Sequence, residues 1–236
     1  MSVAPAVVRN QLTISGGLTL GYREWGRPDG PVAILLHGVD GAADDWALVG
    51  PDLGRRFRVI ALDARGHGQS DWADSYELTD FCDDVLKMMD ALGVVAAAVV
   101  GHSLGAAVAY LLAATHPDRV RVLVLEDMPV APADPPREIP DGPEPGQVTD
   151  WAAVAAVYAW RNDPDPAWWD YAAEIQAQTL VVGGARSHLP QDRLAELAAL
   201  IPRGRFTSLD TGHCVHADRP GQFLAVVAPF LDGAIH

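Results

Sequence analysis

The chain has 236 residues, 49% of them apolar, and a formal net charge of −14 from 31 acidic and 17 basic residues. The apolar fraction excludes an intrinsically disordered chain, and the length fits a single large α/β or all-β domain. Because binding to phosphate backbones requires clustered Lys and Arg, the charge argues against nucleic acid and against anionic membrane surfaces as partners.

Short apolar runs and helix-period stretches alternate along the chain. Residues 11–14 and 18–22 flank Gly16-Gly17, which predicts a hairpin. Buried strands are predicted over residues 32–36, 59–62, 94–100, 122–125 and 180–182, and a more alternating strand over residues 205–209. Helices are predicted over residues 76–92, 104–115, 191–200 and 221–231. We therefore expect one α/β domain over residues 1–236, with a mostly parallel sheet and helices on both faces.

One segment interrupts this alternation. Residues 129–146 contain seven prolines and cannot be regular throughout. Thr149-Asp150 then offers a helix N-cap ahead of an Ala- and aromatic-rich stretch. We interpret residues 128–172 as a short helical insertion outside the sheet.

No cofactor or secretion signal is expected. The two cysteines, Cys82 and Cys214, exclude a disulfide framework and a cysteine metal site. The glycines after Leu36 lack G-x-G-x-x-G spacing. Residues 1–17 lack the basic and apolar regions of a signal peptide, and no apolar run approaches the ~20 residues of a membrane span. The expected location is the cytoplasm.

The sharpest motif is Gly101-His102-Ser103-Leu104-Gly105, between a predicted strand and a predicted helix. A serine on such a tight turn projects its hydroxyl from the sheet edge, and side chains two residues to either side would collide. We predict that Ser103 is a nucleophile. A serine needs a base, and His213, which follows Gly212 after the last predicted strand, is the candidate. His216 is expected to point elsewhere.

These features together resemble the α/β-hydrolase family, and the resemblance covers essentially the whole chain. Residues 37–41 (HGVDG) look like the family's His-Gly loop, and residues 63–70 (DARGHGQS) look like its D-x-R-G-x-G-x-S segment. Gly212-His213 and residues 219–223 resemble the catalytic-histidine loop and the final helix. The resemblance implies a small-cap, esterase-like serine hydrolase.

The resemblance also implies an oxyanion hole. Its donors would be the backbone N–H groups of Leu104, just past the nucleophile, and of Val39, just past His37-Gly38. Asp63, His37 and His102 are expected to be structural.

The sequence departs from the family at the acid that should orient the histidine. His188 stands where this acid would be expected, after the next-to-last strand, and cannot serve. We predict that Asp127, at the tip of the strand after the elbow helix, has moved into the role. Its neighbour Glu126 should point to the opposite face by the period-2 rule, but it remains an alternative, as do Asp192 and the absence of an acid.

Four aromatic residues of the insertion, Trp151, Tyr158, Trp160 and Trp168, are expected to line a substrate pocket. They could equally pack the insertion onto the body of the domain.

The functional hypothesis is a serine hydrolase that cleaves a small-to-medium, largely apolar ester, lactone or thioester through an acyl-enzyme on Ser103. The many acids near the expected site mouth disfavour an anionic substrate. The alternatives are a lyase, cyclase or C–C hydrolase of secondary metabolism, or a non-catalytic ligand-binding protein on the same fold.

Overall fold

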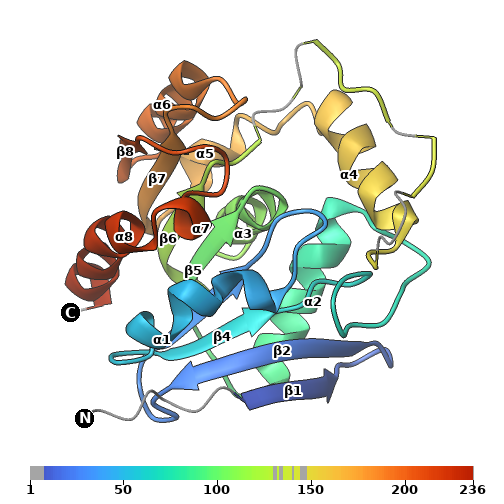
Figure 1. Cartoon of the computed structure of the whole chain (residues 1–236), viewed down its shortest axis with the longest axis vertical. Helices are drawn as coiled ribbons and strands as arrows, with labels where there is room; N and C mark the ends of the chain where they lie inside the picture. Colours follow the sequence, from blue (N-terminus) through green and yellow to red (C-terminus); the bar gives the residue numbers. More distant parts are fainter. Residues whose placement is uncertain (1–7, 130–131, 133–134, 140, 144–147, 236) are drawn as a thin grey trace.

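Figure 1 shows an eight-stranded sheet with helices on both sides and one helix, α4, standing away from it. The computed structural model describes residues 8–129, 132, 135–139, 141–143 and 148–235. The strands are β1 (Val8–Thr13), β2 (Thr19–Gly26), β3 (Val32–Leu36), β4 (Arg58–Leu62), β5 (Ala97–His102), β6 (Val120–Glu126), β7 (Gln178–Gly184) and β8 (Gly204–Leu209). Their order is β1-β2-β4-β3-β5-β6-β7-β8, and all pairings from β4 to β8 are parallel. The predicted α/β architecture is confirmed.

The helices separate into two layers. They are a 3-10 helix η1 (Ala43–Leu48), α1 (Gly50–Leu53), α2 (Leu78–Ala91), α3 (Leu104–Thr115), α4 (Trp151–Asn162), α5 (Tyr171–Glu174), α6 (Gln191–Leu200), α7 (Val215–Asp218) and α8 (Pro220–Ile235). Side chains of α2, α3 and α6 form one core with one face of the sheet. Those of η1, α1 and α8 form a second core on the other face.

The strand sequences explain the two cores. In β3, Ile34 and Leu36 enter the first core, whereas Ala33 and Leu35 enter the second. All four are 5% exposed or less. A strand buried on both faces must be continuously apolar, because successive side chains point to opposite faces. This is why the central strands were predictable from short apolar runs.

Several element boundaries differ from the prediction. Strand β5 begins at Ala97 rather than at Val94, because residues 93–96 turn out of α2 before pairing starts. The short elements η1, α1, α5 and α7 were not predicted. Each spans only four to six residues, too few to display a helical period.

The chain leaves the sheet between β6 and β7, and the predicted insertion of residues 128–172 falls in this connection. Asp150 is the N-cap of α4 and accepts a hydrogen bond from the Ala152 N–H at 3.0 Å. Part of the insertion, residues 130–131, 133–134, 140 and 144–147, lies outside the described residues. None of the helices in the described part of the chain combines the length and apolar character that a membrane span requires.

Candidate active site

Ser103 occupies a strained turn between β5 and α3. Its φ is +51°, in the left-handed region that non-glycine residues rarely adopt. A Cβ at Gly101 would collide with the Gly105 carbonyl, and a Cβ at Gly105 would collide with the Leu36 carbonyl. Both glycines are therefore required by close backbone approach, as the motif suggested. The turn leaves Ser103 at the carboxyl edge of the sheet, 6% exposed.

The loop after β3 lies directly against this turn. A Cβ at Gly38 would come 2.9 Å from His102 Nδ1 and 3.2 Å from Ser103 Cβ. The Gly105 N–H donates to the His37 carbonyl at 3.0 Å, which joins the loop to the first turn of α3. The His-Gly loop and the predicted nucleophile are thus neighbours.

Two backbone amides in this region are available to a ligand. Among the residues that the structure describes, the N–H groups of Val39 and Leu104 donate to no protein acceptor. Leu104 is the first residue of α3, where the helix leaves its N–H groups unpaired and carries a partial positive charge. Their roles as oxyanion donors remain a prediction, and their placement is compatible with it.

His37 holds the loop in shape, as expected of a structural residue. Its Nδ1–H donates to the Gly38 carbonyl at 2.7 Å, and its Nε2 accepts the Ala64 N–H at 3.0 Å. The two partners together fix the tautomer. Burial lowers the pKa of His37, so the imidazole stays neutral in this role.

His213 and Asp127 form a short hydrogen bond in the site. The His213 Nδ1–H donates to Asp127 Oδ2 at 2.6 Å, so Nε2 is the nitrogen left to accept a proton. Asp127 is fully buried and also accepts hydrogen bonds from Ser187 Oγ at 2.5 Å, the Gly184 N–H at 3.1 Å and Gln191 Nε2 at 3.1 Å. Burial acts to raise the pKa of Asp127, but these four donors outweigh it and the pKa is lowered. The carboxylate is therefore ionised.

The stretch after β7 supplies donors instead of an acid. The carboxylate that arrives from β6 is bound by Gly184 at the end of β7, by Ser187 and by Gln191 at the start of α6. His188 packs edge-on against His213, with ring centroids 4.9 Å apart. Asp192 follows Gln191, and no hydrogen bond or ion pair links it to His213 in the described chain.

Glu126, the alternative acid, has a different partner. The His216 Nδ1–H lies 2.8 and 2.9 Å from its two carboxylate oxygens, and the His216 backbone N–H donates to Oε1 at 2.9 Å. Both side chains are buried, and His216 stacks on Trp46 with ring centroids 4.2 Å apart. Burial acts to raise the pKa of Glu126, but His216, its two hydrogen-bonding groups and His102 together outweigh it, and the pKa is lowered. Sequence reasoning missed this second pair, although strand alternation had already separated Glu126 from Asp127.

His102 connects the nucleophile turn to the histidine loop. Its Nε2–H donates to the His213 carbonyl at 3.1 Å, and the two rings lie 4.7 Å apart. Burial lowers the pKa of His102 to about 4. A neutral His102 therefore attaches the backbone of His213 to the turn that carries Ser103.

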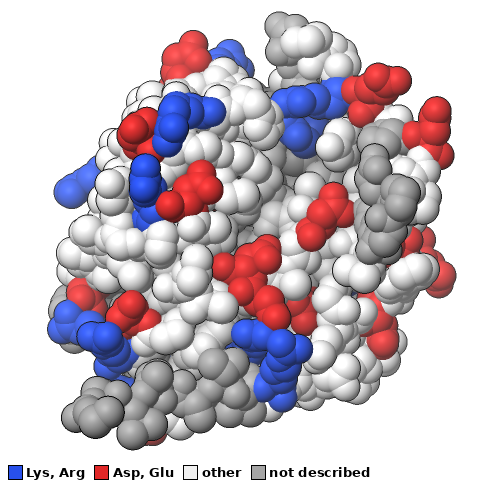
Figure 2. All heavy atoms as spheres, viewed as in Figure 1, with Lys and Arg blue, Asp and Glu red and all other residues white. Residues whose placement is uncertain are grey.

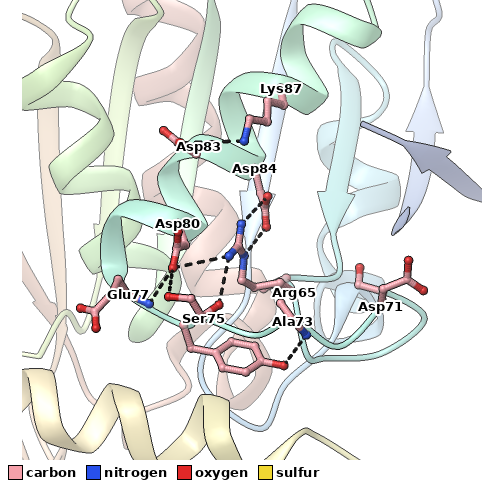
Figure 3. A network of polar contacts seen from close by, with 12 residues as sticks. Arg65, Asp71, Ala73, Ser75, Glu77, Asp80, Asp83, Asp84 and Lys87 are labelled. Atoms are coloured by element: carbon pink, nitrogen blue, oxygen red, sulfur yellow. Dashed lines mark hydrogen bonds and ion pairs between the residues drawn. The ribbon is translucent and has the colours of Figure 1, made fainter. Parts of the chain in front are cut away.

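The D-x-R-G-x-G-x-S segment is structural, as the resemblance implied. Asp63 accepts the N–H groups of Ala43 at 2.7 Å and Gln69 at 3.1 Å. Figure 3 shows Arg65 reaching from this loop to α2. It forms two 2.7 Å hydrogen bonds with the Asp84 carboxylate and one of 3.0 Å with the Ser75 carbonyl.

The four aromatic residues predicted to line a pocket differ in their burial and in their contacts. Trp168 is 2% exposed, packs on Tyr110 at 4.8 Å between ring centroids, and forms a T-shaped contact with Trp160 at 4.9 Å. Trp151 and Tyr158 are half-buried on α4. In the described part of the chain, no ring contact or hydrogen bond joins any of these four residues to Ser103 or His213. Their role in substrate binding remains a prediction.

Comparisons with known proteins agree with this fold. The family model of the alpha/beta hydrolase fold matches residues 31–156. A hydrolase from Pseudomonas aeruginosa has a solved structure that superposes with a TM-score of 0.83 at 28% identity, covering 94% of this chain and 98% of that one. The chain belongs to the α/β-hydrolase family.

Curated relatives match the chain in part. A bifunctional esterase/perhydrolase from Acinetobacter calcoaceticus is 40% identical over 118 residues, which is 48% of this chain and 42% of the relative. The 2-(acetamidomethylene)succinate hydrolase of Mesorhizobium japonicum is 39% identical over 113 residues, 48% of this chain and 40% of the relative. The aligned regions span about half of the relatives or less, so the activity of this chain has to be argued from its own site.

Proposed function

We propose that this protein is a serine hydrolase that cleaves a small-to-medium carboxylic ester, lactone or thioester with a largely apolar acyl chain. The observation that carries the proposal is the 2.6 Å hydrogen bond between His213 and the buried Asp127 carboxylate, on a loop that His102 attaches to the Ser103 turn. The names of the relatives, an esterase/perhydrolase and a hydrolase, support hydrolysis at a carbonyl group.

The proposed reaction has two halves. In the first, Ser103 Oγ attacks the carbonyl carbon while His213 Nε2 takes the hydroxyl proton, and the same proton then passes to the departing alcohol or thiol. In the second, water attacks the acyl-enzyme, His213 takes its proton and returns it to Ser103, and the carboxylic acid leaves. Asp127 stabilises the imidazolium in both halves, and the amides of Val39 and Leu104 bind the oxyanion.

A non-catalytic role was suggested by the absence of an acid at the usual position. The Asp127–His213 hydrogen bond argues against that role, because a carboxylate from the end of β6 takes the place of the missing acid.

The test is a fluorophosphonate probe together with p-nitrophenyl esters. We expect a covalent adduct and ester turnover in the wild type and neither in Ser103→Ala. A wild-type protein that forms no adduct at pH 8 and hydrolyses no ester would overturn the proposal.

A further inference from the structure

A cleft of about 670 Å³ opens next to His188. Its walls come from the proline-rich insertion, the C-terminal part of α4 and the start of α6: Pro132, Pro135, Pro136, Arg137, Glu138, Arg161, His188, Leu189, Pro190 and Arg193. His188 lines this cleft and also contacts His213 at 4.9 Å between ring centroids. The cleft therefore reaches the ring that packs against the proposed base.

The lining of this cleft is positively charged, in a chain whose net charge is −14. Three of the 17 basic residues, Arg137, Arg161 and Arg193, lie in it, and Glu138 is the one acid among its described lining. Figure 2 shows Lys or Arg side chains in the corresponding region, between α6 and α4. The acid-rich composition of the segment did not predict this local reversal of charge.

Among the residues that the structure describes, two of the three guanidinium groups have no carboxylate partner. Arg193 stacks over Trp169 at 4.5 Å and lies 3.5 Å from Glu196. By contrast, no described carboxylate forms an ion pair with Arg137 or Arg161. The Nε of Arg161 is buried and has no hydrogen-bond partner in the described part of the chain. Leaving such a donor unpaired costs free energy, and the described part of the chain does not itself satisfy this guanidinium N–H.

The side chain of Asn162 holds these two arginines close together. The Arg137 N–H donates to Asn162 Oδ1 at 2.7 Å, and Asn162 Nδ2 donates to the Arg137 carbonyl at 2.8 Å. Because Asn162 follows Arg161 in α4, this clamp sets both arginines beside the same cleft. Burial, and then the charge of Arg137, lowers the pKa of Arg161, which is the expected effect of a nearby like charge.

We propose that Arg137 and Arg161 bind a carboxylate group of the substrate, so that the ester cleaved at Ser103 carries a second, anionic end. Arginine suits this role because its planar fork of donors matches a carboxylate and stays charged. The inference rests on the proposed function and narrows its substrate class: an apolar acyl chain ends in a carboxylate that reaches past His188.

The test compares mono-p-nitrophenyl glutarate, whose acyl chain ends in a carboxylate, with the neutral p-nitrophenyl hexanoate. The quantity measured is the kcat/KM for the glutarate ester divided by the kcat/KM for the hexanoate ester. We expect Arg161→Gln and Arg137→Gln each to lower this ratio about 10-fold or more, because each loses a charge-assisted hydrogen bond. Arg161→Lys, which keeps the charge, should retain more of the ratio. Arg203→Gln, an exposed arginine outside the cleft, should leave it unchanged. An unchanged ratio in both cleft variants overturns the inference.

A binding measurement separates this inference from the proposed function. In Ser103→Ala, which cannot turn over an ester, glutarate should raise Tm, and the further change Arg161→Gln should abolish the rise. If the wild type hydrolyses both esters but glutarate stabilises neither protein, the anion site is refuted and the hydrolase stands. If no ester is cleaved but glutarate still stabilises through Arg161, the hydrolase fails and the anion site stands.

Discussion

The His213 Nδ1–H donates to Asp127 Oδ2 across 2.6 Å, although the two residues follow strands that are not neighbours. Asp127 follows β6 and His213 follows β8, with β7 between them. The carboxylate crosses the end of β7 because the chain there offers donors, including the Gly184 N–H, and no acid.

Replacing Asp127 by Asn should lower kcat/KM by about 10³–10⁴-fold while the protein remains folded, because the amide cannot hold His213 in the productive tautomer or stabilise its imidazolium. Ester hydrolysis measured beside circular dichroism checks this. Asp210→Asn is the control, since Asp210 is an exposed carboxylate paired with Arg186 at 2.9 Å. Loss of activity in Glu126→Gln but not in Asp127→Asn would assign the acid to Glu126 instead.

Gly38→Ala should lower kcat by about 100-fold through displacement of an oxyanion donor. The added methyl group would lie 2.9 Å from His102 Nδ1 and 3.2 Å from Ser103 Cβ, so the loop carrying Val39 has to move. Gly221→Ala is the matched control, because a Cβ there meets nothing within 4 Å. Wild-type kcat in Gly38→Ala would show that the Val39 amide is not needed.

His216→Ala should lower the free energy of unfolding by about 3–5 kcal/mol, the range for leaving one buried charge without its partner. In this variant the ionised Glu126 carboxylate loses its side-chain hydrogen bonds, because they come from the His216 ring. Urea unfolding measures the loss. His116→Ala, near the surface, should change it by less than about 0.5 kcal/mol. A loss below about 1 kcal/mol in His216→Ala would mean that solvent reaches Glu126.

Stability should fall as the pH is lowered from 6.5 toward 4. Burial lowers the pKa values of His67 and His102 to about 4 from an ordinary 6.5. Between these values the unfolded chain binds protons that the folded protein does not, so acidification favours unfolding by up to roughly 3 kcal/mol for each group. Urea midpoints measured across this range check the slope, and His67→Gln should reduce it. A flat profile would show that both histidines titrate normally when folded.

The nucleophile turn was predictable because its causes are local. Gly101 and Gly105 are dictated by backbone contacts within five residues and with the adjacent strand. The central strands were predictable for a similar reason, since burial on both faces leaves a continuous apolar run. The short elements η1 and α7 were not, because their positions depend on contacts such as Trp46 with His216 rather than on their own periodicity.

By itself, the sequence determined the α/β architecture, the position of Ser103 and the restriction of the acid to a few candidates. The tertiary structure decided how the two carboxylates at the end of β6 are shared: Asp127 binds His213, and Glu126 binds His216. It also brought Arg137 and Arg161 into one cleft beside His188, within an acidic protein. The net charge averages over the whole chain, whereas the charge of a binding site depends on the few side chains that the fold places around it.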